Sequence, residues 1–373
     1  MPANSPSPIR RIAITTGGGD APGLNSVIYA VTRAAEHQGW DCLGIRDGYD
    51  GLLRPERFPG GGCMRLTAER VEGIAGLGGT LLGSTNKGDP FAFPTPQADG
   101  GMLLCDRSQD VLDALAHEGV DALVAVGGDG SLAIAHRFAQ RGLKVVGLPK
   151  TIDNDLVHTA TTFGFDTAVD FATDCIDRLH TTAASHHRIL VVEVMGRYAG
   201  WIALHAGLAG GAHVILLPEL PFNLDIVADL IRRRDARGMA YSIVVVAEGA
   251  RPLDGKRVVV APAGGGHAER LGGVGEQVTT ELAQLTGKDS RCVVLGHLLR
   301  GGSPTAFDRV AALRFGTAAV RSLAAGQSDI MVALDGNEVR AVPLADVAGR
   351  MKVVPVEGDT VATARALGIC LGA

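Results

Sequence analysis

Short runs of apolar and β-branched residues alternate with longer amphipathic stretches along this chain. This alternation is typical of βαβ units, whose parallel strands are covered on both faces and read as near-continuous Val, Ile and Leu. Leu24, Val27, Ile28 and Val31 have the i, i+3, i+4, i+7 spacing that predicts a helix after the first strand. A second helix is predicted over residues 167–179. The predicted strands are residues 11–16, 122–126, 144–148, 189–194, 214–217, 242–247 and 293–295.

The composition is that of a folded globular protein. The 373 residues include 51 glycines, about double the usual share of ~7%, without the period of collagen. Hydrophobic residues make up 46% of the chain, and a chain of this length buries ~75% of its unfolded surface, so we expect two lobes of one protein. The net charge of −5, from 35 basic and 40 acidic residues, argues against nucleic acid as a partner. Any site for an anion must therefore be local.

No segment of the sequence predicts a membrane or secreted protein. Residues 1–9 form a polar arm rich in Pro and Ser, which we expect to be flexible and which lacks the apolar core of a signal peptide. No apolar stretch reaches the ~18–20 residues of a membrane helix, so we expect a cytoplasmic protein without a membrane partner. The glycine-rich residues 263–275 are predicted to form a mobile loop. Six scattered cysteines without metal-ligand spacing are expected to be reduced and buried: Cys42, Cys63, Cys105, Cys175, Cys292 and Cys370.

Three of the predicted strands are followed by turns rich in glycine or aspartate. These turns are residues 17–23, 127–131 and 149–155. In open α/β sheets, ligands bind outside the carboxyl ends of the strands. The three turns are therefore where we predict the functional site.

The first turn, Gly17-Gly-Gly-Asp-Ala-Pro-Gly23, is suited to phosphate. Backbone N–H groups can surround phosphate oxygens where no Cβ prevents a close approach, and a following helix adds a partial positive charge. The turn is not the dinucleotide fingerprint, because Pro22 stands where the third glycine belongs, and the chain has no P-loop pattern. A tight turn without a ligand is the alternative interpretation.

The second turn combines three glycines with an acid, Gly127-Gly-Asp-Gly-Ser131. Main-chain amides could hold phosphate here while Asp129 holds Mg²⁺, which prefers one or two carboxylates plus substrate phosphates. The alternative is that Asp129 only caps a helix or a turn.

The third turn places Asp153 and Asp155 two residues apart. In an extended segment the two side chains would project to the same side and perturb each other's pKa. One carboxylate could accept a proton from a sugar hydroxyl that attacks a phosphoryl group. A solvated turn with two acids is the alternative.

Arginines gather at strand boundaries in the second half of the chain, namely Arg188, Arg197, Arg291 and Arg300. Because arginine binds phosphate bidentately, their convergence in a net-acidic protein favours a phosphate pocket. Each one taken alone is more often a surface ion pair.

Six segments together, in order and spacing, resemble the 6-phosphofructokinases, of the phosphofructokinase A type. These segments are residues 16–25, 127–131, 149–155, 185–189, 192–198 and 294–304, and the match spans about residues 11–322. The resemblance implies two Rossmann-like three-layer lobes with the active site in the cleft between them. Residues 10–164 with 298–345 would form the donor lobe, and residues 165–297 with 346–373 the sugar lobe.

The resemblance also implies the glycolytic transfer of a phosphoryl group from a Mg²⁺-bound donor to the C1 hydroxyl of fructose 6-phosphate. Asp153 would be the base, Arg197 would steady the transferring charge, and Thr151 and Lys150 would complete the catalytic group. Asp129 would bind Mg²⁺. The residues implied to bind the donor are Gly18, Asn86, Lys87, Gly128, Asp129, Gly130 and Ser131.

Fructose 6-phosphate would be held by a second set of residues. Arg188, Arg291 and Arg300 would grip the 6-phosphate, with Arg188 and Arg291 arriving from a neighbouring subunit of a homodimer or homotetramer. The full implied set is Thr151, Asp153, Arg188, Met195, Gly196, Arg197, Glu248, Arg291, His297 and Arg300.

Departures from the bacterial ATP-dependent pattern concern the phosphoryl donor and resemble the mixed-substrate subgroup. Lys150 stands where the bacterial ATP-dependent enzymes carry a glycine, as it does in pyrophosphate-using relatives. Asn86 stands where an arginine usually contacts the donor, and Lys87 could take over the role of that arginine. Gly130, however, stands where pyrophosphate users carry a second aspartate. An aspartate there would repel a nucleotide α-phosphate, and exclusion discriminates more strongly than a permissive charge, so ATP is the expected donor and pyrophosphate the alternative.

Two further functions share part of the pattern. NAD kinases and lipid kinases also carry a Gly-Gly-Asp-Gly turn, but they leave the motifs at residues 151–155 and 297–302 unexplained. A non-catalytic sugar-phosphate sensor could keep the pocket, although it would be free to lose Asp153.

Overall fold

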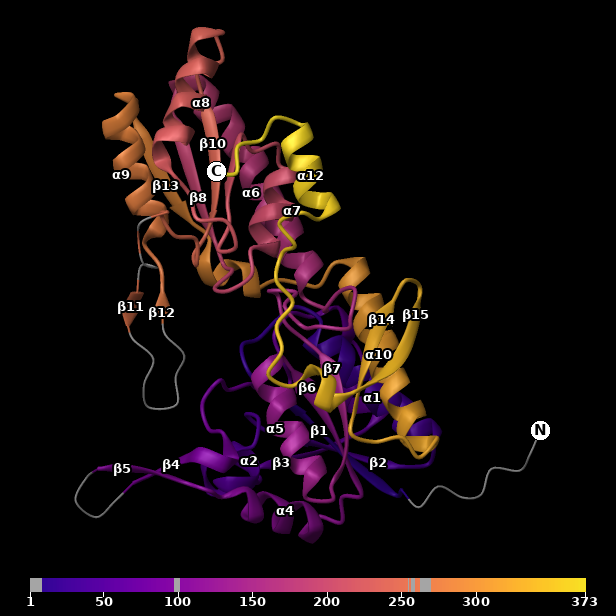
Figure 1. Cartoon of the computed structure of the whole chain (residues 1–373). Helices are drawn as coiled ribbons and strands as arrows, with labels where there is room; N and C mark the ends of the chain where they lie inside the picture. The colour runs from indigo at the N-terminus through magenta and orange to yellow at the C-terminus, as the bar shows by residue number, and fades with distance from the viewer. Residues whose placement is uncertain (1–8, 97–100, 254, 256–258, 262–269) are drawn as a thin grey trace.

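The structure, a computed structural model, describes residues 9–96, 101–253, 255, 259–261 and 270–373. The chain forms two α/β lobes, stacked along the long axis of the molecule (Figure 1). The first lobe contains a seven-stranded sheet of order β15-β14-β7-β6-β1-β2-β3, in which only the edge strands β3 and β15 are antiparallel to their neighbours. Its strands are β1 Arg11–Thr16, β2 Asp41–Ile45, β3 Cys63–Leu66, β6 Ala122–Gly127, β7 Lys144–Pro149, β14 Ile330–Asp335 and β15 Glu338–Pro343.

Helices cover both faces of this sheet because alternate strand residues point to opposite sides. In β1, Ile12 and Ile14 pack toward α1 (Leu24–His37) and α10 (Ala306–Ala324), whereas Ala13 packs toward the other face. That other face is covered by α2 Asp50–Leu53, α4 Ser108–His117, α5 Asp129–Gln140 and α11 Leu344–Val347. The strands are therefore buried on both sides and continuously apolar, as the sequence predicted.

The second lobe repeats this architecture around a smaller sheet of order β13-β8-β10-β9, in which all pairs are parallel. Its strands are β8 Ile189–Val194, β9 Val214–Leu216, β10 Ser242–Ala247 and β13 Ser290–Val294. One face packs on α6 (Phe165–His186) and α7 (Trp201–Ala209), and the other on α8 (Leu224–Ala236) and α9 (Val274–Thr286). These two lobes confirm the α/β class with mainly parallel sheets.

The remaining elements are short and lie outside the two sheets. The β4–β5 hairpin projects from the first lobe and carries three exposed apolar side chains, Met102, Leu103 and Leu104. A second hairpin pairs β11 with β12. The bounds are β4 Phe93–Pro96, β5 Met102–Cys105, β11 Val259–Ala261, β12 Arg270–Leu271, α3 Ala68–Val71 and α12 Asp359–Ala366, with 3₁₀ turns η1 Pro55–Arg57, η2 Ile74–Gly76, η3 Pro90–Ala92 and η4 Gly296–Arg300.

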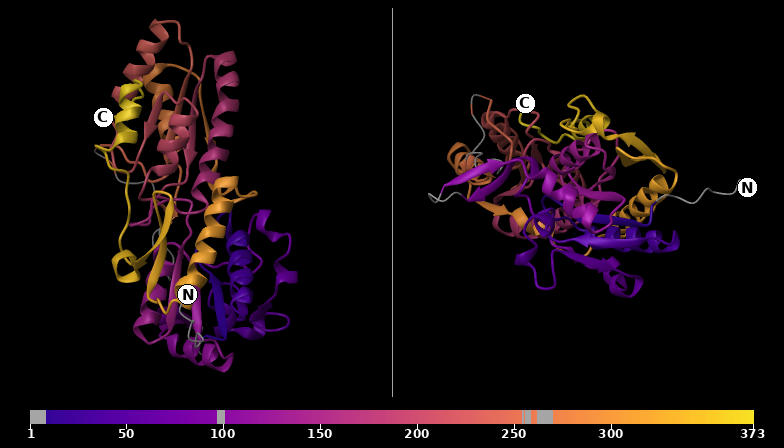
Figure 2. Two further views of the ribbon diagram at one scale, coloured as in Figure 1. Left: turned by 90° about the vertical axis from the view of Figure 1, so that its right-hand side faces the viewer. Right: turned by 90° about the horizontal axis from the view of Figure 1, so that it is seen from below.

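The C-terminal segment leaves the first lobe and ends on the second. Val347 belongs to the core of the first lobe, whereas Val354 and Val361 belong to that of the second. Cys370 forms a parallel bridge with Val214 of β9, so the end of the chain adds to the second sheet. Figure 2 shows this yellow segment along the side of the molecule, reaching from one lobe to the other.

Several sequence predictions are corrected by the structure. The helix predicted over residues 167–179 runs from Phe165 to His186, because its last two turns are largely exposed and bury only Ala183, which leaves no apolar stripe to detect. The strand predicted at residues 293–295 begins at Ser290 and ends at Val294, since this edge strand is only partly covered and Leu295 already leaves the ladder.

Other corrections concern loops and thiols. Ile9, placed in a flexible arm, is buried in the core, and the rest of that arm lies outside the described residues. In the glycine-rich segment 263–275, residues 263–269 are also not described, but Arg270 and Leu271 form β12 and α9 has begun at Val274. The six cysteines are free thiols as expected, but only Cys42 is fully buried. No helix in the described parts of the chain is both long and apolar enough to span a bilayer.

The packing of α1 against α10 predicts a stability difference between two phenylalanines of α10. Phe315 is fully buried and lies 6.5 Å from Phe163 between ring centroids, whereas Phe307 on the same helix is 50% exposed. We expect Phe315→Ala to lower the free energy of unfolding by about 3–5 kcal/mol, because it leaves a cavity. Phe307→Ala should change it by about 0.5 kcal/mol or less. Urea unfolding of both variants measures the difference, and equal effects would contradict this account of the core.

Candidate functional site

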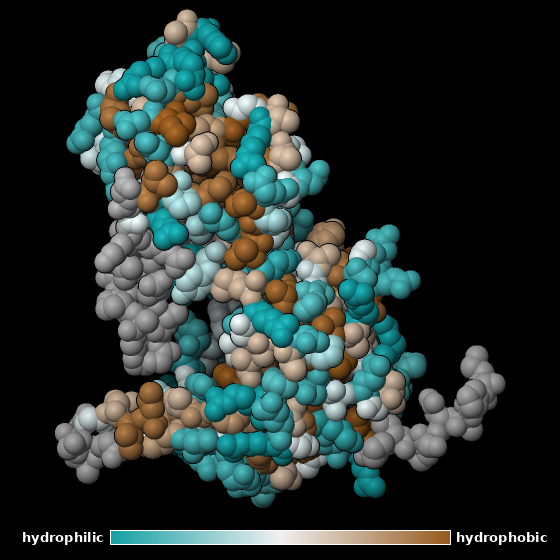
Figure 3. Space-filling view, viewed as in Figure 1, coloured by the Kyte–Doolittle hydropathy of each residue, from teal (hydrophilic) through white to brown (hydrophobic). Residues whose placement is uncertain are grey.

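A cavity of about 570 Å³ lies at the carboxyl ends of β1, β6 and β7, where the two lobes meet. The turns after all three strands line it, together with residues 85–89. Arg197, which follows β8, and Arg300, which follows β13, reach it from the second sheet. The space-filling view shows the surface hollowed between the lobes (Figure 3). The three turns predicted from the sequence therefore share one site.

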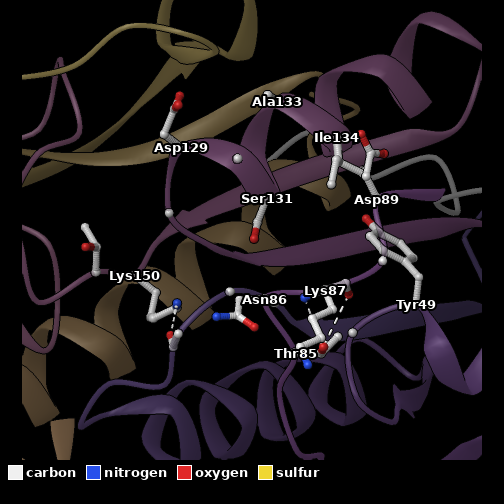
Figure 4. Close-up of a pocket in the computed structure, with 18 of the residues that line it drawn as sticks. Tyr49, Thr85, Asn86, Lys87, Asp89, Asp129, Ser131, Ala133, Ile134 and Lys150 are labelled. Carbon is white, nitrogen blue, oxygen red and sulfur yellow. Dashed lines mark hydrogen bonds between the residues drawn. The ribbon is translucent and has the colours of Figure 1, made fainter. Parts of the chain in front are cut away.

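The turn after β1 approaches its neighbours too closely for side chains. A Cβ on Gly19 would lie 2.6 Å from the Arg300 guanidinium, and Gly18 has a left-handed φ of 79°. The Gly18 N–H donates to Thr85 O at 2.9 Å, and Ser84 Oγ donates to Gly18 O at 2.6 Å. These bonds bring Asn86 and Lys87 to the same rim of the cavity (Figure 4).

The turn after β6 leads directly into α5. Gly128 occupies the N-cap position and Asp129 is the first helical residue, so Asp129 is not the capping residue that the alternative interpretation required. Its Oδ1 instead accepts a hydrogen bond from Gly349 N at 2.9 Å. Ser131 packs against Gly127, where a Cβ would lie 2.2 Å from Ser131 Cβ. The amino end of α5, with its free N–H groups and partial positive charge, therefore lines the cavity.

Gly130 differs from the other glycines of the site. It is exposed, its φ is not in the left-handed region, and an added Cβ would meet nothing within 4 Å. The fold itself therefore does not require glycine at this position. The open space beside Gly130 is part of the cavity.

Lys150 is buried between the turns after β1 and β7. Its Nζ donates to Gly19 O, as the dashed line in Figure 4 shows. Burial, with a smaller contribution from nearby Arg300, lowers the pKa of Lys150 to about 8. Asp20, Asp153 and Asp155 act in the opposite direction. A lysine with such a pKa loses its charge near neutral pH more readily than a surface lysine does.

The turn after β7 is not the extended segment that the sequence suggested. Asn154 has a φ of 51°, in the left-handed region, and the segment bends around Ile152 and Asp153. Asp153 and Asp155 nevertheless interact, and burial raises the pKa of both. The pKa of Asp155 reaches about 6, with Asp153 as the second cause.

Three cations oppose the effect of burial at Asp153. Arg300, Arg197 and Lys150 each lower the pKa of its carboxyl, in that order. Arg197 Nε is buried and has no hydrogen-bond partner in the described part of the chain. Three cations around one carboxylate, one of them with an unpaired donor, are an arrangement suited to an anionic ligand.

Of the residues predicted after β8, β10 and β13, Arg197 and Arg300 line the cavity, whereas Met195, Gly196, Glu248 and His297 do not. The pKa of Glu248 is raised to about 7, first by burial and then by Asp153, so the two acids are close in space. Gly196 has a φ of 143°, and a Cβ there would lie 2.8 Å from Ala199 O. Met195 packs partly into the core, and His297 is exposed on η4.

Arg188 and Arg291 are not brought to the cavity. They lie at the amino ends of β8 and β13, opposite to the ends that carry Arg197 and Arg300. Arg188 Nε is 2.6 Å from Asp289 Oδ2, and Arg291 also pairs with Asp289, whose pKa is lowered mainly by Arg188. A ligand in the cavity of the same chain cannot use these two arginines.

Sequence reasoning missed the part of the cavity formed after β2. Tyr49 lines it, packs on Phe138 at 5.3 Å between ring centroids, and has a buried hydroxyl without a hydrogen-bond partner in the described chain. Asp89 and Arg137 line the same side. A glycine-rich turn, Asp47-Gly-Tyr-Asp-Gly51, follows the short apolar run of β2 and could have pointed to this part of the site.

The acids of the site fit a divalent cation bound together with phosphate. Asp153 and Asp129 both raise the pKa of Asp155, so these carboxylates lie in one electrostatic field. No group of three or more His, Cys, Asp or Glu side chains in the described residues could hold a metal by itself. This donor set matches Mg²⁺, which takes one or two carboxylates and completes its coordination with phosphate and water.

Comparison with known proteins gives a consistent family. The family model described as Phosphofructokinase matches residues 11–323. An ATP-dependent 6-phosphofructokinase of Chloroflexus aggregans is 50% identical over 97% of this chain and 98% of its own length. A pyrophosphate–fructose 6-phosphate 1-phosphotransferase of Amycolatopsis mediterranei is 51% identical over 93% of this chain and 97% of its own.

Solved structures resemble the whole chain. The phosphofructokinase of Saccharomyces cerevisiae is 31% identical, with a TM-score of 0.77 over 90% of this chain and 45% of that one. A pyrophosphate-dependent phosphofructokinase from Nitrosospira multiformis has a TM-score of 0.78 over 98% of this chain and 93% of that one, at 20% identity, and supports the fold alone.

Proposed function

The chain belongs to the phosphofructokinase family, and we propose that it transfers the γ-phosphoryl group of ATP to the C1 hydroxyl of fructose 6-phosphate. The observation that carries the proposal is the position of Asp153. Its partly buried carboxylate faces Arg300, Arg197 and Lys150 where the glycine-rich turns of one lobe meet the residues after β8 of the other. An acid placed there can take a proton from a hydroxyl while the cations hold the transferred group.

Phosphoryl transfer requires positioning and charge stabilisation more than covalent chemistry. Asp153 would accept the proton of the attacking hydroxyl, and Arg197, with its unpaired Nε, would neutralise charge on the transferred group. Lys150 would add a second cation from the donor side. Thr151 would fix the base, because its Oγ1 accepts the Asp153 N–H at 3.1 Å.

The donor would lie along the glycine turns and the amino end of α5. Gly18, Gly128, Gly130 and Ser131 would line its phosphates, and Asn86 and Lys87 would contact it from the rim beside Gly18. Asp129 would hold Mg²⁺ with the donor phosphates and water. When bound, the ion would neutralise charge on those phosphates.

The sugar would lie against the second lobe, held by Met195, Gly196, Glu248 and His297. We therefore propose the first lobe, residues 10–164 with 298–345, as the donor lobe, and residues 165–297 with 346–373 as the sugar lobe. Because Val347 is buried in the core of the first lobe, we place the end of the donor lobe at about residue 347 instead of 345.

The 6-phosphate would be gripped by Arg300 of the same chain and by Arg188 and Arg291 of a neighbouring copy. The amino-end position of Arg188 and Arg291 supports this arrangement, because they lie away from the cavity of their own chain. We propose a homodimer or homotetramer on this ground. Asp289 pairs with both arginines in this structure, and the 6-phosphate would take its place.

Pyrophosphate is the alternative donor, favoured by one observation. That observation is Lys150, which stands in the cavity as a buried cation. Relatives of both donor classes reach about 50% identity, so identity alone does not separate the two donors. The open space at Gly130 supports ATP more strongly. The fold would accommodate a side chain at this position, yet the space is left free, where a nucleotide α-phosphate could lie. A non-catalytic sugar-phosphate sensor would have no turnover with either donor, so initial rates with ATP and with pyrophosphate on one preparation test all three functions.

Removing the proposed base tests the mechanism. We expect Asp153→Asn to lower kcat by about 10²–10⁴-fold, because the amide cannot accept the hydroxyl proton, while fructose 6-phosphate binding stays largely intact. Steady-state rates and calorimetric titration with the sugar phosphate measure both effects. Asp113→Asn, an exposed acid of α4, is the control and should leave kcat unchanged. Unchanged turnover in Asp153→Asn would refute the assignment.

The donor argument predicts opposite results for two substitutions at one position. Gly130→Asp should abolish ATP-dependent turnover by placing charge where the nucleotide must lie, while any pyrophosphate-dependent turnover persists. Gly130→Ala should fold normally and retain ATP use, because its Cβ meets no protein atom. Initial rates with each donor decide, and ATP activity in Gly130→Asp would overturn the exclusion argument.

The pKa values of the site predict a bell-shaped dependence of kcat/KM on pH. The rate should rise as Asp153 ionises, and fall above pH 8 as Lys150, with its lowered pKa of about 8, loses its proton. Phosphate esters titrate near pH 6 and do not produce the alkaline limb. Lys150→Met should lower the rate and flatten the profile above pH 8. An unchanged alkaline limb in this variant would assign the limb to another group.

A further inference from the structure

The C-terminal chain passes between the lobes beside the site, at residues 349–354, here called the crossing segment. At its start, Gly349 N donates to Asp129 Oδ1 at 2.9 Å. In its middle, Met351 bridges to Leu156, and Lys352 N donates to Asp155 O at 2.7 Å. The crossing segment thus contacts two of the acidic turns that line the cavity.

The side chain of Lys352 is the main anchor of this segment. Its Nζ donates to Asn154 Oδ1 at 2.9 Å, to Thr159 O at 3.0 Å and to Ala160 O at 3.2 Å, so all three ammonium hydrogens have acceptors. Nζ also lies 5.5 Å from the ring centroid of Trp201, at the start of α7 in the second lobe. A neutral or shorter side chain cannot make these contacts together.

Asn154 is the residue that gives the catalytic turn its shape. It is buried, has a left-handed φ of 51°, and stands between Asp153 and Asp155. A non-glycine residue in this region is strained and persists only where its surroundings fix it. Its Oδ1 accepts Thr162 N at 3.2 Å as well as Lys352 Nζ. Loss of the ammonium would remove one of these two constraints and leave Asp153 less well placed.

The crossing segment also holds the opposite side of the site. Val354 N donates to Glu219 Oε1 at 2.8 Å, and the same carboxylate accepts Gly200 N at 3.0 Å. Gly200 ends the loop that contains Arg197. Trp201 Nε1 donates to Lys352 O at 3.1 Å. A six-residue segment therefore contacts the Asp153 turn directly and is linked to the end of the Arg197 loop through Glu219 and Trp201.

We propose that Lys352 is a positioning residue of the phosphoryl transfer: its ammonium fixes the Asn154 turn, and its main chain ties that turn to the Arg197 loop. The role rests on the proposed function, because the placement of Asp153 matters only if Asp153 acts as the base. Lys352 does not line the cavity and is not expected to touch either substrate. Its effect is therefore expected in kcat and not in KM.

The test compares variants of Lys352 with a control on the same C-terminal segment. Lys352→Met keeps the apolar stem and removes the charge, and Lys352→Ala leaves space for an added amine. Arg365→Gln changes an exposed cation of α12 that contacts Val356 O and Glu357, outside the crossing segment. For both Lys352 variants we expect kcat to fall by about 10²-fold with little change in either KM. Arg365→Gln should match the wild type.

Two further readouts separate positioning from a general loss of structure. Propylammonium added to Lys352→Ala should restore part of kcat, and hydrogen exchange of residues 151–162 in the unliganded protein should be faster in Lys352→Met than in Arg365→Gln. If the wild type is active but Lys352→Met keeps its full kcat, the role of Lys352 is overturned and the proposed function is not. The same holds if hydrogen exchange of residues 151–162 is no faster in Lys352→Met than in Arg365→Gln. A wild type inactive with both donors would overturn the proposed function and this role with it.

Discussion

The site depends on the electrostatic balance around one partly buried carboxylate, that of Asp153. Burial raises the pKa of Asp153, because a charge is poorly solvated away from water, and Arg300, Arg197 and Lys150 counteract it. The three cations repel one another, as the effect of Arg300 on Lys150 shows. A polyanion placed among them relieves this repulsion. The cations that favour the ionised form of Asp153 are thus the same groups that would attract a phosphate, so the two properties are coupled.

This balance requires two lobes. The turns that line the cavity follow three parallel strands that lie side by side in the first sheet, and at Gly19 and Gly127 they leave no room for a Cβ. Arg197 and Glu248 come from equivalent strand ends of the second sheet, so the groups that face each other belong to separately packed cores. Their relative position is fixed by the segments that cross between the lobes, of which residues 349–354 make the most direct polar contacts with the acids of the site.

The sequence predicts the fold and the site wherever a single local signal is sufficient. The inner strands β1, β8 and β10 are found at their predicted bounds, because strands covered on both faces are continuously apolar. β3 and β15 were not predicted, since they are edge strands whose polar residues interrupt this pattern. β2 and β14 were not predicted either, although both are inner strands with a mainly apolar run. The three turns could be assigned to one site from their place after strands. Lys352 could not, because the tertiary fold alone brings residue 352 to the turn at 154. Tyr49 lies in a glycine-rich turn after β2, a local signal of the same kind as the other three turns.

The order of strands in the first sheet has a consequence for how this protein is made. β14 pairs with β7 although more than 180 residues separate them in the chain, and the whole second sheet is synthesised in the interval. On the ribosome, β7 is therefore left with an open edge while β8 to β13 emerge and can pair among themselves. An unpaired edge of continuously apolar residues is a template for association with other chains. Until its last strands arrive, the nascent protein carries this hazard, and chaperones that cover such edges would act in that interval.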